Sequence, residues 1–271
     1  KEFLIGSVQK RFVGTTIALD CGHGANSDLA PEVFEALGAT VIVTNREPDG
    51  MNINANCGST NPSIIATLVQ KSGAACGFSF DGDGDRVIPV DETGAVMDGD
   101  HMLAALGLYL KKKGELKGNG ITGTVMTNIG LDKFCEEQGL LLQKAKVGDR
   151  YVLEDMRKSG FSLGGEQSGH IIFLDHNTTG DGLLTALKLV ELMLEEGTPL
   201  SSQNGLMRSY PQVLVNARVH PQKKQDYLED PEITEEIRAL EASYNGRGRV
   251  LIRPSGTEPL VRVMIEGEYE A

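Results

Sequence analysis

The chain has 271 residues, 40% of them hydrophobic and 24% charged. This length exceeds the usual size of a single hydrophobic core and predicts two or three domains of about 100 residues each, while the composition argues against disorder. The formal net charge of −12 opposes binding to nucleic acid and to anionic membranes, so an anionic ligand would need a local basic site.

No stretch of the sequence approaches the ~20 apolar residues that span a bilayer, and residues 1–10 lack the apolar core of a signal peptide. We therefore expect a cytoplasmic protein with no membrane partner. The 4 cysteines form no CxxC pair and no cluster with histidine, so we expect buried thiols rather than a zinc site or disulfides. The first residue is Lys1 rather than Met, which we interpret as the start of a processed or cut chain.

Residues 15–80 alternate between short β-rich runs and amphipathic runs, in the order strand, helix, strand, helix, strand. This order is typical of βαβ units around a parallel sheet. We expect Ser27 or Asp28 to cap the first helix, with Pro31 in its opening turn. The predicted strands are 16–19, 40–43 and 75–80, and the predicted helices are 29–37 and 64–71.

The segment 86–97 is predicted to form a β-hairpin, because two apolar runs flank the turn-forming cluster Asp91-Glu92-Thr93-Gly94. A second alternating set of helices and strands follows, and we expect Asp100 to cap its first helix. Its helices are predicted at 100–110, 130–138, 148–158 and 181–196, and its strands at 121–126, 140–143, 161–163 and 171–174.

The segment 197–210 is polar and rich in turn residues, which predicts a linker or domain boundary. The last part of the chain is ordered differently, with one predicted helix at 231–243 and strands at 213–219, 249–253 and 261–266. The fold class is therefore predicted to be α/β, with two tandem α/β mixed-sheet domains followed by a smaller α+β C-terminal domain. The expected domain boundaries are 1–98, 99–206 and 207–271.

The strongest chemical signal follows an apolar run and is the segment Asp81-Gly82-Asp83-Gly84-Asp85-Arg86. Its three carboxylates can turn to one side of an extended loop, and the glycines let the backbone bend around an ion. Oxygen ligands suit a hard cation, and Mg²⁺ is favoured over Ca²⁺ where phosphate is also bound. An EF-hand is one alternative, since Glu92 stands twelfth from Asp81, but Arg86 stands sixth, where glycine is required. A solvated acidic turn is the other alternative.

The second signal lies between two short predicted strands and is the segment Gly164-Gly165-Glu166-Gln167-Ser168-Gly169-His170. Glu166, Ser168 and His170 stand at alternate positions and could form hydrogen bonds with vicinal hydroxyls of a sugar. A glycine-rich turn whose polar side chains face water would have the same pattern, so this motif is weak by itself.

The third signal is the segment Arg253-Pro254-Ser255-Gly256-Thr257-Glu258-Pro259, with Arg262 on the next predicted strand. Its backbone N–H groups, hydroxyls and two guanidinium groups could bind a phosphate, and they form the local basic site that an acidic chain needs. The alternative is a simple turn in which Glu258 pairs with Arg262. Together the three loops predict phosphoryl transfer on a sugar phosphate.

In this order and at these separations, the three loops resemble the metal-binding, sugar-binding and phosphate-binding loops of the α-D-phosphohexomutase superfamily, over nearly the whole chain. Gln167 and the segment 54–60 are more similar to the phosphoglucosamine mutase branch than to the phosphomannomutase/phosphoglucomutase branch, which usually has Met in place of Gln167. The resemblance implies interconversion of two hexosamine phosphates, glucosamine 6-phosphate and glucosamine 1-phosphate, for UDP-N-acetylglucosamine and cell-wall synthesis.

The resemblance also implies roles for individual residues. Asp81, Asp83 and Asp85 would bind Mg²⁺ together with a phosphoserine. The phosphoserine would donate its phosphoryl group to the sugar phosphate, which gives a sugar 1,6-bisphosphate. Arg86 would neutralise the transferring phosphoryl group. The segment 146–150 lies where relatives carry further active-site residues. The substrate-binding residues would be Glu166, Ser168, His170, Arg253, Ser255, Gly256, Thr257 and Arg262.

The serine loop of the superfamily, Thr-Ala-Ser-His-Asn-Pro or close to it, occurs nowhere in the 271 residues. We therefore expect a fragment that lacks the N-terminal domain of the same protein, binds Mg²⁺ and sugar phosphate weakly, and has no mutase activity alone. The lost neighbour would expose apolar surface and favour association, for example as a homodimer. Two alternatives stay open: a phosphomannomutase/phosphoglucomutase, and a non-catalytic sugar-phosphate binding module.

Overall fold

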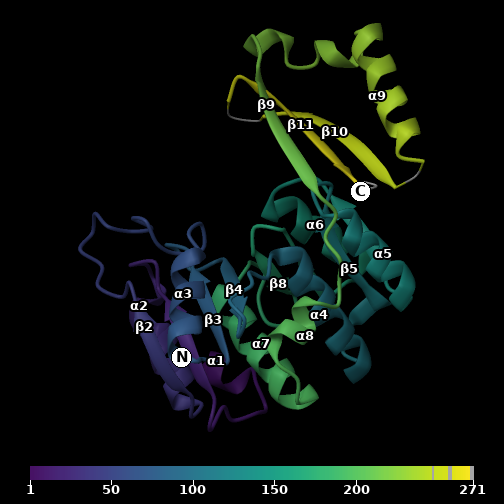
Figure 1. Cartoon of the computed structure of the whole chain (residues 1–271). Helices are drawn as coiled ribbons and strands as arrows, with labels where there is room; N and C mark the ends of the chain where they lie inside the picture. The colour runs from purple at the N-terminus through teal and green to yellow at the C-terminus, as the bar shows by residue number, and fades with distance from the viewer. Residues whose placement is uncertain (246, 256–257, 269–271) are drawn as a thin grey trace. The chain divides into compact units, whose positions relative to one another are not determined.

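The computed structural model describes residues 1–245, 247–255 and 258–268 (Figure 1). The chain divides into two compact units. Unit 1 comprises Lys1–Thr127 and Leu131–Met207, and unit 2 comprises Asn128–Gly130 and the chain from Arg208 onward. Within the described ranges, no helix is both long enough and apolar enough to cross a membrane.

The first sheet of unit 1 has four strands in the order β2-β1-β3-β4. Strands β2, β1 and β3 run parallel, and β4 pairs antiparallel with β3. The strands are β1 (Thr16–Asp20), β2 (Thr40–Thr44), β3 (Cys76–Phe80) and β4 (Val87–Asp91). The helices are α1 (Glu2–Gly6), which precedes the sheet, and α2 (Asn26–Ala36) and α3 (Ser63–Ser72), which connect the parallel strands.

Helices α2 and α3 cover opposite faces of this sheet. Ile17 and Leu19 belong to the main core together with Phe34 of α2, whereas Ala18 packs in a separate cluster with Ile65 of α3. Because successive side chains of a strand point to opposite faces, the two helices lie on opposite sides of the sheet. A parallel sheet covered on both faces accounts for strands that are apolar almost throughout.

The second sheet of unit 1 repeats this arrangement, with four strands in the order β6-β5-β7-β8. Strands β6, β5 and β7 run parallel, and β8 pairs antiparallel with β7. Its strands are β5 (Gly120–Thr124), β6 (Leu141–Ala145), β7 (Leu163–Gly165) and β8 (Ile171–Phe173). Its helices are α4 (Gly99–Lys113), α5 (Ile129–Gln138), α6 (Asp149–Ser159) and α7 (Gly182–Glu196), with a 3-10 turn at Lys117–Asn119.

The two sheets of unit 1 share one hydrophobic core. Helix α7 contacts both α4 and the strands β3 and β4 of the first sheet. Buried residues from both halves, such as Phe78 of β3, Leu163 of β7 and Leu187 of α7, therefore belong to a single cluster. This packing fixes the loops at the ends of the two sheets relative to each other.

Unit 2 is built on a three-stranded antiparallel sheet in the order β10-β11-β9. Figure 1 shows α9 running beside β10. The carboxylate of Asp230 accepts hydrogen bonds from the backbone N–H groups of Glu232 and Ile233 and so caps this helix. The elements are β9 (Gln212–Arg218), α9 (Pro231–Ser243), β10 (Gly248–Pro254) and β11 (Leu260–Gly267), with 3-10 turns at Pro221–Lys223 and Asp226–Leu228.

The predicted fold class is confirmed, because two mixed-sheet α/β halves precede a smaller antiparallel α+β part. The boundaries at 1–98, 99–206 and 207–271 stay a prediction. Apart from residues 128–130, the first two of those domains lie together in unit 1.

Helix α2 begins earlier than the sequence suggested. It starts at Asn26 after Ala25, so Ser27 and Asp28 lie inside the helix and neither caps it, and Pro31 lies beyond the opening turn. The helix has no side-chain cap. A contact with a distant loop, described below, holds its start instead.

The predicted hairpin at 86–97 is present but short. Val90 and Val96 form an isolated antiparallel bridge, and beside it the backbone N–H of Asp91 donates to Ala95 O at 3.0 Å and that of Met97 donates to Pro89 O at 2.9 Å. The sequence did not predict a second hairpin, in which β4 pairs with β3 around the acidic loop.

The predicted linker at 197–210 contains a short helix, α8 (Leu200–Asn204). Ser201 donates from both its backbone N–H and its hydroxyl to the carboxylate of Glu92. The same contact excludes the EF-hand alternative, because Glu92 is bound to α8 and strands, not helices, flank the acidic loop. The polar composition of the segment did not reveal this tertiary contact.

Helix α4 is capped by Asp98 and not by Asp100. The Asp98 carboxylate accepts from the backbone N–H of His101 at 3.0 Å, which is the geometry of an N-cap. Asp100 lies in the first turn of the helix and is fully buried.

Substitution of this cap should lower stability. Asp98→Ala leaves a backbone donor at the start of α4 without its acceptor, so we expect the free energy of unfolding to fall by about 1 kcal/mol. Urea denaturation followed by circular dichroism measures the change. The exposed Glu137→Ala in α5 is the control and should stay within about 0.5 kcal/mol of the wild type. Equal stability of Asp98→Ala and the wild type would contradict the assignment of the cap.

Candidate functional site

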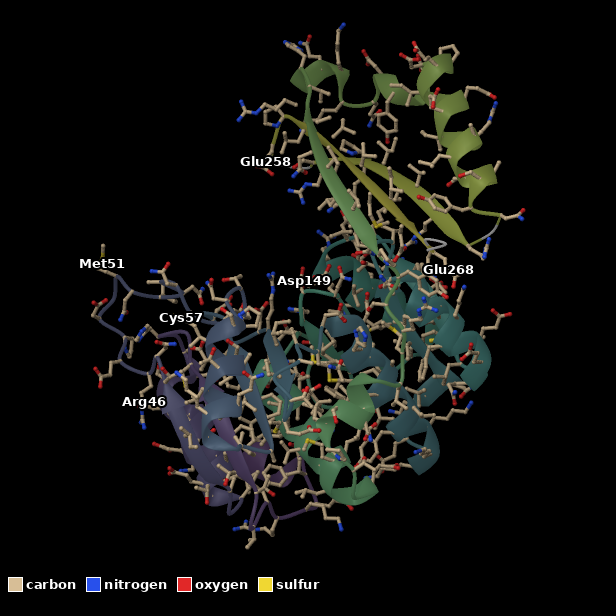
Figure 2. The ribbon with its side chains drawn as sticks, in the orientation of Figure 1. Arg46, Met51, Cys57, Asp149, Glu258 and Glu268 are labelled. Carbon is tan, nitrogen blue, oxygen red and sulfur yellow. The ribbon has the colours of Figure 1, made fainter. Side chains whose placement is uncertain are left out.

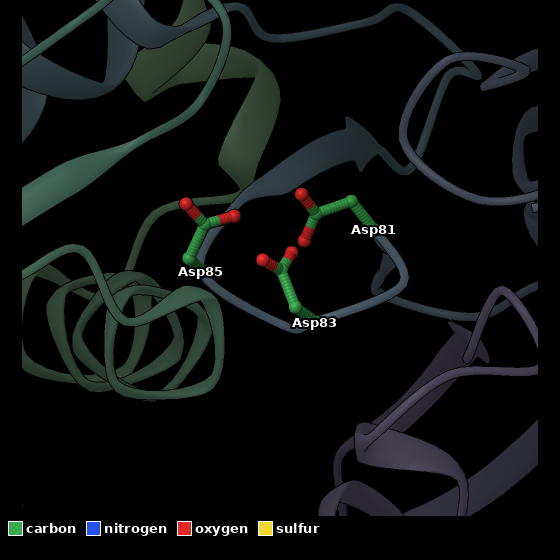
Figure 3. A group of neighbouring side chains, drawn as sticks. All are labelled: Asp81, Asp83 and Asp85. Atoms are coloured by element: carbon green, nitrogen blue, oxygen red, sulfur yellow. The ribbon is translucent and has the colours of Figure 1, made fainter. Parts of the chain in front are cut away.

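The acidic loop connects β3 and β4, and its three carboxylates converge (Figure 3). Oxygen atoms of Asp81, Asp83 and Asp85 lie within 4.8 Å of one another. The loop closes on itself, because Asp81 Oδ1 accepts from the backbone N–H groups of Gly84 and Arg86, each at 3.1 Å. Gly84 has a φ of +78°, a conformation that glycine adopts without strain.

The electrostatics of this cluster fit a bound cation. Burial, followed by the hydrogen bond with Asp85, raises the pKa of the Asp81 carboxyl from 3.8 to about 7. For Asp85 burial also acts upward, but the hydrogen bonds and charges of Asp81, His170 and Arg86 outweigh it and lower the pKa. Arg86 Nε lies 3.9 Å from Asp81 Oδ2 and 3.8 Å from Asp85 Oδ1. Three carboxylates with one nearby guanidinium leave a net negative site, which suits a hard divalent cation.

Asp85 is positioned by a buried histidine. His170 is 1% exposed, and its Nδ1 lies 2.9 Å from Asp85 Oδ2. Its other ring nitrogen, Nε2, accepts the backbone N–H of Gly180 at 3.0 Å. Because Nε2 accepts, the ring proton sits on Nδ1, which therefore donates to Asp85. A Cβ on Gly180 would lie 2.6 Å from the imidazole, so this approach requires glycine.

The sugar-loop residues follow β7 just as the acidic loop follows β3. Glu166 Oε1 accepts the backbone N–H of Gly148 at 2.9 Å, which leaves its other carboxylate oxygen available. Ser168 is exposed at the tip of the loop. The loop is joined to the start of β4, since Gly169 O accepts the backbone N–H of Val87 at 3.2 Å.

The acidic loop and the Glu166 loop of unit 1 are therefore adjacent and hydrogen-bonded. The acidic loop follows the carboxyl end of β3, and the Glu166 loop follows the carboxyl end of β7. Open α/β sheets bind their ligands at the carboxyl ends of their strands. His170 was predicted to bind sugar, but its side chain is buried and contacts Asp85 instead. The sugar-binding roles of Glu166 and Ser168 stay predictions.

The predicted phosphate loop connects β10 and β11 of unit 2. Arg253 and Arg262 stand directly opposite each other in the antiparallel register. Like charges in this position repel, so an anion between the guanidinium groups would stabilise the pair. Ser255 is buried, and its Oγ accepts the backbone N–H of Glu258 at 3.2 Å. Gly256 and Thr257 lie outside the described residues.

The alternative for this loop, a simple turn in which Glu258 pairs with Arg262, is partly observed. Arg262 Nη2 donates to Glu258 Oε2 at 3.0 Å, and Figure 2 labels Glu258 in the turn. The contact involves one nitrogen of the Arg262 guanidinium group. The phosphate-binding roles stay predictions.

Three family models match consecutive parts of the chain. They describe alpha/beta/alpha domain II of phosphoglucomutase/phosphomannomutase over residues 2–94, alpha/beta/alpha domain III over residues 98–210, and the C-terminal domain over residues 214–271. The chain belongs to the phosphoglucomutase/phosphomannomutase family.

Curated relatives give a finer comparison within the family. The phosphoglucosamine mutase of Finegoldia magna is 56% identical over 269 residues, which cover 99% of the chain and 60% of that relative. The phosphoglucosamine mutase of Alkaliphilus metalliredigens is 56% identical over 270 residues, which cover 100% of the chain and 60% of that relative. The chain thus spans about 60% of the length of the curated relatives that it matches.

Solved structures share the fold. A phosphoglucomutase/phosphomannomutase family protein from Burkholderia thailandensis has a TM-score of 0.79 at 24% identity, over 99% of this chain and 59% of that one. The N-acetylphosphoglucosamine mutase of Aspergillus fumigatus, in complex with GlcNAc-6P and magnesium, has a TM-score of 0.76 at 20% identity, over 98% of this chain and 60% of that one. At such low identity the likeness concerns the fold alone.

Sequence reasoning missed the residues that hold the site of this phosphoglucomutase/phosphomannomutase family member together. Gly180 and Gly148 act through backbone N–H groups, which no motif reveals.

Asp20 is fully buried and accepts four hydrogen bonds, two of them from the backbone N–H groups of Gly22 and Gly58 at 3.0 Å. An aspartate at the end of an apolar strand and just before a Cys-Gly pair was the available signal. Figure 2 shows Asp149 at the exposed start of α6, next to Gly148.

Because the pKa of Asp81 is raised, replacing this residue should stabilise the metal-free protein but weaken metal binding. The folded-state pKa lies above the ordinary value, so the protonated form stabilises the fold at low pH and this stabilisation is lost as the pH rises through about 7. Asp81→Asn mimics the protonated form. In EDTA we expect it to melt at a higher temperature than the wild type at about pH 8, with a smaller difference near pH 6.

Addition of Mg²⁺ should reverse the order, because the wild type gains the binding free energy and Asp81→Asn does not. The exposed Asp49→Asn, in the loop after β2, is the matched control and should behave as the wild type in both conditions. Thermal melts at the two pH values measure the effect. A lower melting temperature for Asp81→Asn in EDTA at both pH values would contradict the raised pKa.

Proposed function

We propose that the protein to which this chain belongs is a phosphoglucosamine mutase, which interconverts glucosamine 6-phosphate and glucosamine 1-phosphate through a phosphoserine and a sugar 1,6-bisphosphate. The proposal rests on one observation: hydrogen bonds join the acidic loop to the Glu166 loop, one of them made by His170. It is supported by the phosphoglucosamine mutase relatives at 56% identity.

The acidic loop would hold the metal in this reaction. Asp81, Asp83 and Asp85 offer convergent oxygen atoms, and Asp85 Oδ1 is buried without a hydrogen-bond partner among the described residues, as a metal ligand would be. Bound Mg²⁺ would supply positive charge to the transferring phosphoryl group. Arg86, at the end of the same loop, would add a guanidinium group that stabilises charge on the phosphoryl oxygens.

Other residues would bind and orient the sugar phosphate. The oxygen of Glu166 that Gly148 leaves available would accept from a sugar hydroxyl, and the Ser168 hydroxyl would bind a second one. His170 would hold Asp85 rather than the sugar. The residues proposed to hold the phosphate that does not react are Arg253, Ser255, Gly256, Thr257 and Arg262.

The phosphoryl donor is proposed to lie outside these residues, since the 271 residues contain no Thr-Ala-Ser-His-Asn-Pro loop. Binding would then be separable from turnover. A cytoplasmic location, a part in cell-wall precursor synthesis and a homodimeric state stay predictions.

Substrate binding and turnover test this proposal together. We expect the purified chain to bind glucosamine 6-phosphate more tightly than mannose 6-phosphate in the presence of Mg²⁺, by isothermal titration calorimetry, and to convert neither. A preference for the mannose ester would favour a phosphomannomutase instead. Turnover by the chain alone would contradict the placement of the phosphoryl donor outside it.

A conservative variant tests the role of Glu166. Glu166→Gln keeps an acceptor oxygen for Gly148 but replaces the second carboxylate oxygen by an amide, so we expect the affinity for glucosamine 6-phosphate to fall about 10-fold or more. Glu137→Gln on the exposed face of α5 is the control and should bind as the wild type does. Unchanged affinity in Glu166→Gln would remove Glu166 from the sugar site.

A further inference from the structure

The start of α2 lies against the backbone of the acidic loop. The backbone N–H of Ala25 donates to Gly82 O at 2.9 Å. A Cβ on Gly24 would lie 2.4 Å from the same carbonyl oxygen, so the two segments approach as closely as glycine permits. The contact joins the 11-residue helix α2 to the loop that carries the three carboxylates.

The first residue of α2 has a side chain that lacks a partner. Asn26 is 6% exposed, and its Nδ2 has no hydrogen-bond partner among the described residues. The side chain faces the acidic loop, because a Cβ on Gly84 would lie 2.6 Å from Asn26 Nδ2. Asp85 Oδ1, on the next residue of the loop, is buried, accepts no hydrogen bond from the described residues and lies 3.8 Å from Arg86 Nε. Buried polar groups are nearly always hydrogen-bonded, so a buried donor packed against Gly84 and a buried acceptor on the next residue of the loop, both without a hydrogen bond, indicate a missing ligand.

We propose that Asn26 is a further residue of the metal site, whose Nδ2 donates a hydrogen bond to an oxygen atom carried by the bound metal, either a water or a phosphoryl oxygen. The inference rests on the metal site under the proposed function. Asp85 Oδ1 would bind the cation directly, and Asn26 would bind an oxygen in its coordination shell. The position at the N-terminus of α2 fits, since the positive end of a helix favours oxygen ligands over the cation itself.

A packing role is the competing account, in which the Asn26 amide only fills the space over Gly84. The two accounts differ for the metal-free protein. A packing role requires the amide for stability without metal, whereas an unpartnered buried donor costs stability until the metal arrives. Removal of the amide therefore separates them.

The test is Mn²⁺ binding by the whole chain, measured by electron paramagnetic resonance, with Asn26→Leu as a variant of similar size and no donor. We expect an affinity about 10-fold weaker than that of the wild type, with no fall of the melting temperature in EDTA. Asn26→Ala serves as a second variant with the same expected loss if the leucine side chain does not fit. Ser27→Ala is the matched control, because Ser27 Oγ is also buried without a partner in the described chain but is not placed against Gly84.

Repeating the titration with inorganic phosphate identifies the oxygen. A loss with Mn²⁺ alone assigns a metal-bound water, and a loss that occurs with phosphate only assigns a phosphoryl oxygen. Wild-type affinity in both variants under both conditions overturns this inference and leaves the metal site intact. Failure of the wild type to bind Mn²⁺ overturns the metal site, and this inference with it.

Discussion

One buried imidazole joins the parts of the candidate site in unit 1. His170 donates to Asp85 through Nδ1 and accepts the backbone N–H of Gly180 through Nε2, and both bonds are satisfied by the neutral ring. The first bond orients a predicted metal ligand, and the second anchors the ring to the segment that leads into α7. Since His170 ends the sugar loop, the ligand and the sugar loop cannot move independently. Groups that orient metal ligands in this way commonly matter for affinity as much as the ligands do.

The repeated sheet topology explains why two loops from different halves of the chain meet. In both sheets the fourth strand turns back antiparallel to the third, and the loop between them carries the polar residues. Helix α7 packs on both halves and fixes the distance between these loops. The arrangement has a cost, because carboxylates held together repel one another in the absence of a cation. Burial and the hydrogen bond with Asp85 raise the pKa of Asp81, and the charges of Asp85 and Asp83 add to this.

The elements with clear local signals were predictable from the sequence. Helix α9 was predicted with the bounds observed, because Asp230 and Pro231 mark its start and the strands on either side have a different period. The acidic loop was recognised because three carboxylates alternate with glycines after an apolar run. The start of α2, helix α8 and the capping role of Asp98 were missed or misplaced, since each depends on a contact with a residue far along the chain or on a choice between two nearby aspartates.

The residues of the candidate site likewise divide into those that the sequence predicted and those that it did not. Side chains that would meet a ligand, such as Asp83 and Ser168, could be inferred from residue type and spacing. The groups that hold them, such as Gly180 and Asn26, could not, because a backbone N–H or a lone amide has no sequence signature. His170 was recognised as a member of the motif, but its burial beside Asp85 became visible only in the structure.

The central claim is that His170 joins the acidic loop, proposed to bind the metal, and the Glu166 loop, proposed to bind the sugar, into one site. The most direct measurement is the affinity of His170→Ala for Mn²⁺ and, separately, for glucosamine 6-phosphate, compared with the wild type. We expect both affinities to fall about 10-fold or more, because Asp85 loses the group that orients it and the sugar loop loses its anchor. A folded His170→Ala variant that keeps both wild-type affinities would contradict the claim.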